Sequence, residues 1–252
     1  PPGRPPVCER FGPVPAPGPG TEAGFAVPGV AAGEGRLRGS AGQVRWDLSL
    51  SDDGRPLYTF PRWAWARNVL PAAQILPAPT EWLEGQVRVG EQELPFAGPG
   101  GFARIYGHGN AERWAWLHAD LGDGDVLEVV TAVSRRPGMR RLRPLPFVQL
   151  RVDGRDWPRD PLLAAPLFTA EPALPEWSVR GVAGRHRLTA HVRLDPVESV
   201  TLDYRDPDGS PAVCTNSERA SADVLLERWD RGWHVHRRWR LDGTAHAEVG
   251  TR

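Results

Sequence analysis

Two neighbouring segments concentrate the side chains that could carry chemistry. In residues 102–110, aromatic and polar residues occupy every second position: Phe102, Arg104, Tyr106, His108 and Asn110. In residues 114–120 the same spacing holds for Trp114, Trp116, His118 and Asp120. Each set shares one face of a strand, because strand side chains alternate between faces. Burying Trp beside His, Arg and Asn is costly unless every polar group has a partner. The pattern therefore fits either a ligand or catalytic pocket or a barrel interior closed by paired polar residues.

Two closely spaced pairs that contain histidine lie near the end of the sequence: one is His-x-His and the other is His-x-Glu. His234 and His236 have a spacing that zinc ligands use, but arginines flank them and no third ligand accompanies them. We therefore predict a solvated strand face there and no metal site. His246 and Glu248 also share a face, and this spacing fits both a surface pair and a pocket pair.

The composition argues against several functional classes. All basic residues are Arg, 31 in number, and 31 acidic residues balance them. Without lysine there is neither Schiff-base chemistry nor a phosphate-loop lysine, and zero net charge argues against a nucleic-acid partner. No serine lies in a Gly-x-Ser-x-Gly elbow. Cys8 and Cys214 are far apart in the sequence and are predicted to be plain thiols. No run of 18 apolar residues predicts a transmembrane segment.

Short alternating runs separated by Asp-Gly and Gly-Asp turns fill most of the sequence after residue 40. They predict strands over residues 44–50, 82–89, 92–96, 102–110, 114–121, 126–133, 147–152, 177–180, 187–194, 200–204, 224–228, 233–241 and 245–249. Many short strands without intervening helices favour an antiparallel sandwich or barrel. One stretch, residues 63–75, has helical character that Pro71 interrupts. Its Trp63 and Trp65 either line the same pocket or only pack.

Several short motifs, in order, resemble the superfamily of carotenoid hydratases, tocopherol cyclases and AttH-like proteins. The similarity runs over about residues 80–252. It begins with the strand and turn at 85–90 and ends with the closing strand 243–250, which has Glu248 at its acidic position. Between them lie the turn Asp123-Gly124 and the central motif residues Gly101, Tyr106, His108, Trp114 and Trp116. Gly107 stands where the family has an acidic Asp, and Asn110 stands where it has Trp.

The resemblance implies an all-β fold of two consecutive lipocalin-like antiparallel β-barrels, the first short or incomplete. With it we predict a Pro/Gly-rich segment over 1–40, an N-terminal lipocalin-like half over 41–110 and a C-terminal barrel over 111–252. The implied function is a cofactor-independent cyclase, isomerase or hydro-lyase acting on a lipophilic, isoprenoid- or polyketide-like substrate. Two alternatives stay open: a carrier that binds a hydrophobic small molecule unchanged, and a structural β-protein whose Trp residues only pack.

The resemblance also suggests roles for the residues of the two segments. His108 is the expected acid or base, Asn110 and Arg104 orient the substrate, and the rings of Tyr106, Trp114 and Trp116 stabilise a carbocation. His118 and Glu248 are expected to bind the ligand. Asp120, Glu112 or Glu248 would replace the missing acid.

The remaining expectations concern partners and location. We predict a hydrophobic small-molecule ligand, no cofactor, no nucleic acid and no particular oligomeric state. A cytoplasmic or membrane-peripheral location is expected, although the sequence begins with Pro rather than Met, so the lack of a signal peptide here carries little weight.

Overall fold

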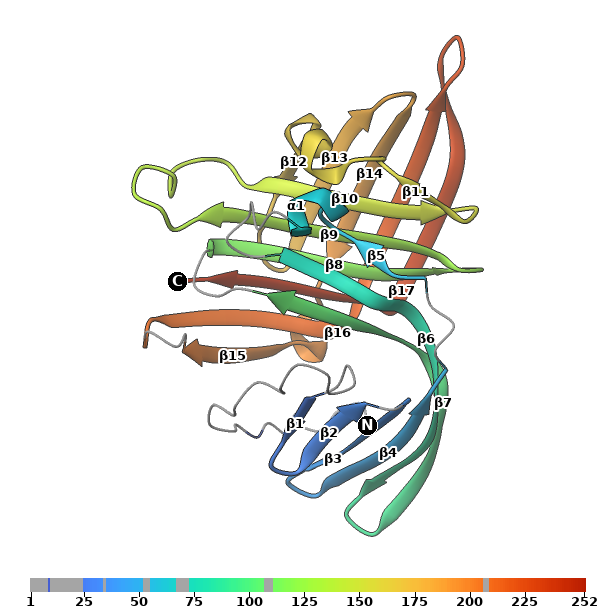
Figure 1. Ribbon diagram of the computed structural model, residues 1–252, viewed down its shortest axis with the longest axis vertical. Helices are drawn as coiled ribbons and strands as arrows, with labels where there is room; N and C mark the ends of the chain where they lie inside the picture. The colour runs from blue at the N-terminus through green and yellow to red at the C-terminus, as the bar shows by residue number, and fades with distance from the viewer. Residues whose placement is uncertain are drawn as a thin grey trace. The chain divides into compact units, whose positions relative to one another are not determined.

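Strands make up almost all of the regular structure of this protein (Figure 1). The computed structural model describes residues 9, 25–33, 35–51, 55–66, 73–106, 111–205 and 209–252. Within these ranges the helical elements are short: α1 (Arg62–Ala66), α2 (Pro161–Ala164) and two single 3-10 turns at Ala165–Leu167 and Pro196–Glu198. None of the helices in the described residues has the length and apolarity needed to cross a membrane.

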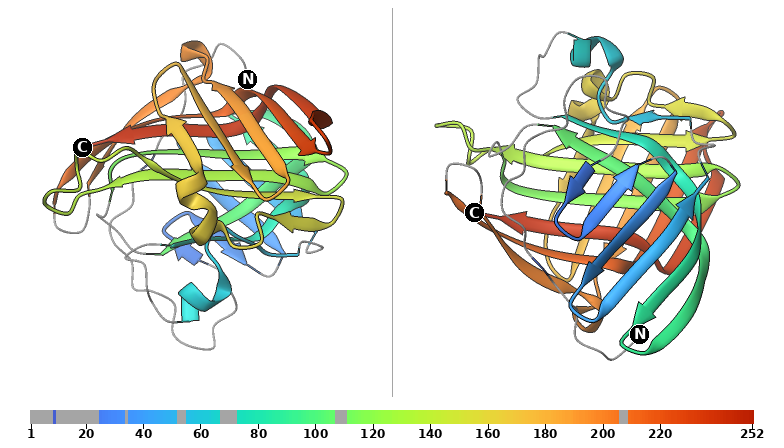
Figure 2. Two further views of the ribbon diagram at one scale, coloured as in Figure 1. Left: turned by 90° about the horizontal axis from the view of Figure 1, so that it is seen from above. Right: turned by 60° about the horizontal axis from the view of Figure 1, so that its bottom comes forward.

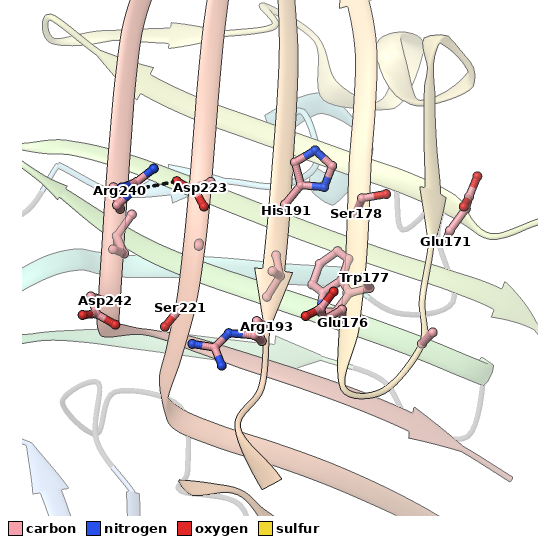
Figure 3. A pocket seen from close by; sticks show the side chains of 14 residues that line it. Glu171, Glu176, Trp177, Ser178, His191, Arg193, Ser221, Asp223, Arg240 and Asp242 are labelled. Carbon is pink, nitrogen blue, oxygen red and sulfur yellow. Dashed lines mark hydrogen bonds and ion pairs between the residues drawn. The ribbon is translucent and has the colours of Figure 1, made fainter.

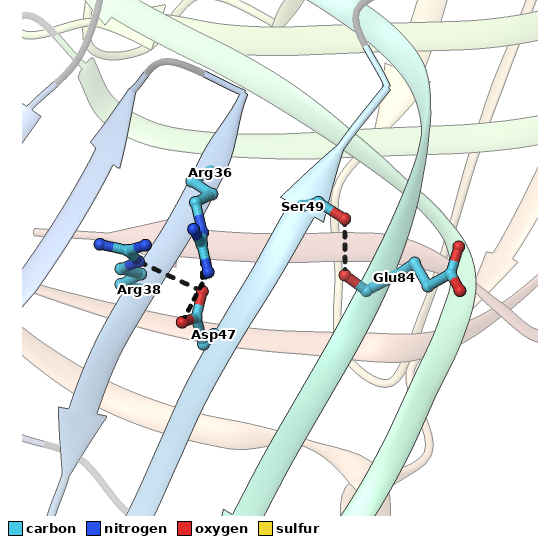
Figure 4. A network of polar contacts seen from close by, with 5 residues as sticks. All are labelled: Arg36, Arg38, Asp47, Ser49 and Glu84. Carbon is cyan, nitrogen blue, oxygen red and sulfur yellow. Dashed lines mark hydrogen bonds and ion pairs between the residues drawn. The ribbon is translucent and has the colours of Figure 1, made fainter.

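The first sheet has seven antiparallel strands. They are β1 (Phe25–Val27), β2 (Val30–Gly33), β3 (Arg36–Ala41), β4 (Val44–Leu50), β5 (Leu57–Tyr58), β6 (Ala73–Val89) and β7 (Gln92–Tyr106). Their order is β1-β2-β3-β4-β6-β5, with β7 also on β6. On this sheet Arg36 and Arg38 bind the carboxylate of Asp47 on the neighbouring strand, and the Ser49 hydroxyl donates to the carbonyl of Glu84 (Figure 4).

The second sheet has ten strands and carries most of the sequence. They are β8 (Ala111–Gly122), β9 (Asp125–Ser134), β10 (Leu145–Val152), β11 (Arg155–Trp157), β12 (Phe168–Glu171), β13 (Glu176–Ala183), β14 (His186–Arg193), β15 (Val200–Arg205), β16 (Pro211–Trp229) and β17 (Trp233–Thr251). The order is β11-β10-β9-β8-β17-β16-β14-β13-β12, with β15 also on β16. The sheet curls until β12 contacts β10, which closes a barrel (Figure 2).

The described residues form two compact units that interleave along the sequence. One contains residues 1–55 and 78–102, and the other contains residues 56–77 and 103–252. The strands β6 and β7 therefore each contribute residues to both units. The sequence-based partition at residues 40 and 110 stays a proposal.

Period-two alternation explains which faces are buried. On β8, the residues Ala115, Leu117 and Ala119 are fully buried in the interior of the second barrel, as their apolar alternation predicts. The strand β9 is buried on both faces, because Leu127 and Val129 point into the barrel while Val126 packs against Leu57 and Leu76 on the other side. Residues of the 56–77 segment thus cover the outer face of β9.

The expectation of an all-β, antiparallel fold is confirmed, while several boundaries differ. The stretches 82–89, 92–96 and 102–110 were expected as three strands, whereas β6 and β7 are long and continuous, because edge pairing tolerates the prolines of β7. The strands β16 and β17 are also longer than predicted, since irregularities in their pairing near Ser217, Ala220 and Ala222 absorb the breaks in alternation. Of the predicted helical stretch 63–75, residues 63–66 belong to helix α1, residues 73–75 belong to β6, and residues 67–72 lie outside the described residues.

Candidate active site

Three adjacent strands of the second barrel bring acids, histidines and indoles to one face. The register sets His118 on β8 directly opposite His246 on β17 and Glu128 on β9, and it sets Trp116 opposite Glu248. This face is the outer side of the same strands whose inner side carries Ala115 and Leu117. The alternation in the sequence therefore predicted correctly that Trp114, Trp116 and His118 share one face of the strand, away from the apolar interior.

Glu128 is the centre of the site, and its side chain is fully buried. The side-chain amide of Gln74 donates to Oε1 of Glu128 at 2.7 Å, and the indole N–H of Trp116 donates to the same oxygen. The other carboxylate oxygen lies 2.9 Å from Nδ1 of His118. Since an unpaired buried carboxylate is very costly, these three partners are what allows an acid at this position.

The hydrogen-bonding chemistry restricts where protons lie around Glu128. An amide NH2 and an indole N–H can only donate, so Oε1 acts as an acceptor. One proton then lies between Oε2 and Nδ1 of His118, which leaves Nε2 as the ring atom of His118 that can exchange a proton with a ligand. A carboxylate that orients a histidine in this way also stabilises the ring when it is protonated.

Gln74 is held by the backbone of the segment that covers β9. Its carbonyl accepts a hydrogen bond from the hydroxyl of the fully buried Thr59 at 2.7 Å. Leu57 and Leu76, both on this segment, are buried against Val126 beside it. Packing therefore fixes the position of Gln74, and with it the amide that donates to Glu128.

A second histidine–carboxylate pair lies beside the first. Nδ1 of His246 is 2.9 Å from a carboxylate oxygen of Glu218, and the His246 ring meets the Trp116 indole edge-on, with the ring centroids 4.4 Å apart. Nε2 of His246 is buried without a hydrogen-bond partner among the described residues. A buried ring nitrogen of this kind is available to a ligand or a water molecule.

The charges around His246 determine its protonation. Burial by itself would lower the pKa of His246, but the hydrogen bond to Glu218 and the negative charges of Glu218, Glu248 and Glu128 outweigh it, and the net pKa is raised. The hydrogen bond from His246 in turn lowers the pKa of Glu218, against a smaller opposing effect of desolvation by neighbouring atoms. Because the Glu218 side chain is 79% exposed, solvent screens much of this attraction.

The third acid, Glu248, links the site to Trp114 and Cys214. The indole N–H of Trp114 donates to Oε1 of Glu248 at 2.8 Å. The pKa of the buried Cys214 thiol is raised, first by burial and then by the charge and the hydrogen bond of Glu248. Cys214 is a free thiol that remains protonated at neutral pH, whereas Cys8, for which the sequence made the same prediction, lies outside the described residues.

The structure brings together only part of the predicted site. His108 and Asn110 lie outside the described residues, and for Tyr106 the structure describes the strand but not the side chain. Arg104 is half-buried near the end of β7. The carboxylate of Asp120 accepts from the amide of Gly122 at 2.9 Å, which places it at the β8–β9 turn.

Other predicted features fall elsewhere or have local partners. Glu112 lies 3.4 Å from the guanidinium of Arg140. His234 is exposed and contacts the carbonyl of Asp230 at 3.1 Å, in keeping with a solvated strand face. Among the described residues, no group of three or more His, Cys, Asp or Glu side chains is arranged to hold a metal ion.

Glu128, Gln74 and Glu218 were not among the residues predicted from the sequence. For His246, the sequence left open whether it belongs to a surface pair or to a pocket pair. One feature of the sequence could have identified Glu128: it is the only charged residue within the apolar run 126–130. Both faces of the strand are buried there, so an acid at this position needs hydrogen-bonding partners. The identity of those partners had no such signal, because Gln74 lies 54 residues away in the sequence.

An open groove of about 800 Å³ lies on the same barrel, apart from these residues (Figure 3). It runs across β12, β13, β14, β16 and β17, and charged side chains of both signs line it, including Glu176, His191, Arg193, Asp223 and Arg240. Arg240 and Asp223 pair with each other at 3.0 Å. None of the residues predicted from the sequence lines this groove.

The fold and the family of the chain follow from comparison with known proteins. The architecture is that of lipocalin-like barrels, in which the first sheet forms only a half-barrel, and the outer face of the second barrel carries an acid–histidine site. The model of the tocopherol cyclase-like family matches residues 21–251. The chain therefore belongs to the tocopherol cyclase-like family, as its central motif suggested.

Two curated relatives and two solved structures show how far the similarity extends. Uncharacterised proteins of Mycobacterium tuberculosis strains H37Rv and CDC 1551 are each 47% identical over 253 residues, covering 100% of this chain and 74% of theirs. Kievitone hydratase from Nectria haematococca has a TM-score of 0.50 at 12% identity, over 85% of this chain and 64% of its own. CghA, solved with Sch210972, has a TM-score of 0.51 at 12% identity, over 86% and 65%.

These comparisons define the fold and the family. At 12% identity the two solved structures show the shared fold alone. This chain also spans less than two thirds of each of them. Activities and ligands of those proteins are therefore considered below only as a proposal.

Proposed function

We propose that this protein is an acid–base catalyst of the cyclase or hydratase type, acting on a lipophilic substrate of isoprenoid or polyketide character. The observation that carries the proposal is the buried carboxylate of Glu128 beside His118. Two neutral donors and the histidine converge on this acid, an arrangement that orients the ring so that Nε2 of His118 can exchange a proton with a substrate. Membership in the tocopherol cyclase-like family supports the reaction class.

In this mechanism His118 delivers a proton from Nε2 to an alkene carbon or a carbonyl oxygen of the substrate. At an alkene, the electron pair of the broken π bond forms the new bond to hydrogen, and the positive charge moves to the adjacent carbon. At a carbonyl, a lone pair of the oxygen takes the proton, and the carbonyl carbon becomes the positive centre. The indole faces of Trp114 and Trp116 stabilise this cation. Water or an internal nucleophile then attacks the cation, and the proton that this step releases returns to His118. Glu128 keeps its hydrogen bond to Nδ1 throughout.

His246 extends the proposal as a second polar contact. Its unpartnered Nε2 adjoins Trp116, so a hydroxyl or carbonyl of the substrate, or the attacking water, is a suitable partner for it. His108 and Asn110 are retained from the sequence as a proposed alternative acid and orienting group. The experiment must therefore distinguish His118 from His108.

The test combines native mass spectrometry with incubation in D2O. Protein purified with its retained lipid is incubated in D2O, and the mass of that molecule is followed. A catalyst that protonates carbon incorporates deuterium, or converts the molecule, whereas a carrier leaves it unchanged. We expect His118→Gln and Glu128→Gln to slow the exchange by about 10²–10⁴-fold. His191→Gln, at an exposed histidine on the same barrel, is the control.

The alternative outcomes are distinct. If His108→Gln alone abolishes exchange, the acid is His108 and the role of His118 is wrong. If the wild type holds a lipid without exchanging deuterium, the carrier function replaces catalysis. If neither the wild type nor the variants retain or convert any lipophilic molecule, the proposal fails altogether.

A further inference from the structure

The tip of the β16–β17 hairpin combines an exposed and a half-buried indole with arginines. The hairpin reaches past the neighbouring β13–β14 hairpin, whose turn residue Arg185 contacts Trp229 and Asp230 (Figure 1). We define the hairpin tip as Arg228, Trp229, Arg231, Trp233 and Val235, together with Arg185 on the adjoining β13–β14 turn. None of these residues belongs to the site described above.

The apolar part of the hairpin tip is exposed and preorganised. Trp229 and Trp233 face each other across the turn, with ring centroids 5.4 Å apart in an edge-to-face arrangement. Trp229 is 43% exposed and Val235 is 61% exposed, while the Trp233 ring is half-buried. The guanidinium of Arg187 lies 4.6 Å from the centre of the Trp233 ring and fixes that indole from the strand side. Leaving Trp229 and Val235 in water is unfavourable, so they indicate a surface that another phase or molecule covers.

The charge at the hairpin tip is positive. Arg187 is paired with Glu227, and Arg185 lies 3.9 Å from Asp230. No carboxylate within the described ranges pairs with Arg228 or Arg231, so these two cations are left for an external anion. The pKa of the nearby His186 is lowered, first by burial and then by the positive charges of His236, Arg228 and Arg185. This agrees with an excess of positive charge at this end of the barrel.

We propose that the hairpin tip docks the protein on an anionic lipid surface, with Trp229 and Trp233 at the level of the headgroups and Arg228 and Arg231 on lipid phosphates and carboxylates. Indole rings favour the boundary between water and acyl chains, where an apolar body and a polar N–H are both satisfied. Arginines beside them gain from the negative surface potential of anionic membranes. The paired indoles and Val235 favour lipid over nucleic acid. They form a compact apolar end, whereas nucleic-acid binding needs a row of basic residues that contact successive phosphates.

The test measures cosedimentation of the protein with vesicles. One set contains phosphatidylcholine alone, and the other adds about 30 mol% phosphatidylserine as the anionic lipid. We expect binding to the anionic vesicles only, weakened by salt. Replacing Arg228 and Arg231 together by Gln should weaken binding by about fivefold for each arginine. Trp229→Ser should weaken it by about tenfold.

Matched variants make the result specific. Trp82→Ser removes another exposed indole, 51% exposed and outside the hairpin tip, and Arg180→Gln with Arg193→Gln removes two exposed arginines elsewhere on the barrel. These variants should bind as the wild type does, and thermal melting should confirm that every variant is folded.

Three outcomes would overturn the proposal. They are an absence of wild-type binding to anionic vesicles, equal losses in the tip and control variants, and tip substitutions that abolish binding to poly(U) RNA while leaving vesicle binding intact. The assay reads binding alone, so its result is independent of whether the barrel is catalytic.

Discussion

At the scale of single residues, the site is defined by carboxylates that would be too costly to bury alone. Glu128 has three partners, and each of the two histidines has an acid of its own. The pairs differ in solvent exposure, because Glu128 is fully buried while Glu218 is largely open to water. The first pair is therefore suited to hold a proton in a fixed place, and the second to respond to pH.

The pH response of the second pair can be predicted with its sign. His246 has a raised pKa, so its contribution to stability is present below its unfolded value of 6.5 and is lost as pH rises through the higher folded pKa. Glu218 has a lowered pKa, so its contribution is present above 4.5 and is lost as pH falls through the lower folded value. We expect His246→Gln to reduce the free energy of unfolding by about 1 kcal/mol between these pH values, and less at pH 9.

Urea unfolding at a series of pH values measures this difference, with the exposed His191→Gln as the control. A wild-type-minus-variant difference that is the same at every pH would show that the pair contributes nothing through its charges.

At the scale of strands, aromatic residues stand directly opposite glycines in three pairs. Trp46 faces Gly39, Trp114 faces Gly250 and Phe168 faces Gly181. In each pair the ring occupies the space where a Cβ of the glycine would lie. The glycine thus lets a large ring lie flat over the neighbouring strand, which fixes both the register and the ring. In the site, this fixes the indole that donates to Glu248.

Filling that space should disturb the site directly. A Cβ on Gly250 would lie 2.1 Å from an atom of the Trp114 indole, so Gly250→Ala has to displace the ring and break its hydrogen bond to Glu248. We expect a loss of about 1–3 kcal/mol of stability and a change in indole fluorescence. Gly98→Ala is the control, because a Cβ there meets Phe96 only at an ordinary 3.7 Å. Equal melting temperatures for both variants would contradict this reading of the glycine.

The strand patterns also show how much could be predicted from the sequence. The alternation over 114–120 correctly separated the inner face from the site face, since that information is local. The long strands β16 and β17 were underestimated, because their irregular pairing breaks the alternation. Gln74 and Glu218 could not be assigned to the site, since only the pairing of distant strands brings them to it. The expectations for His108 and Asn110 stay predictions.

At the scale of the whole molecule, the interleaving of the two units determines what a stable fragment must contain. Residues 56–77 belong with the second barrel, where Leu57 and Leu76 cover Val126, and Gln74 donates to Glu128. A barrel cut at residue 111, where the sequence placed a domain boundary, would lack all three side chains. Glu128 would then lose a donor, and Val126 would be exposed.

We therefore expect a fragment of residues 111–252 to unfold at a lower temperature than the full chain and with less cooperativity, as followed by circular dichroism. In the full chain, Leu57→Ala should by itself cost about 2–5 kcal/mol, because it opens a cavity in the same contact. A fragment that melts as the full chain does, together with a neutral Leu57→Ala, would show that the segment is dispensable for the barrel.

The central place of β17 has a consequence for synthesis on the ribosome. This strand lies between β8 and β16, and its bond from Trp114 to Glu248 spans 134 residues. Until residues 246–251 emerge, the edge of β8 that pairs with β17 has no neighbour, although β8 was translated long before. The nascent chain thus holds an open sheet edge, which is prone to aggregate, for most of the translation of this barrel. Chaperone demand should accordingly be greatest just before β17 is complete.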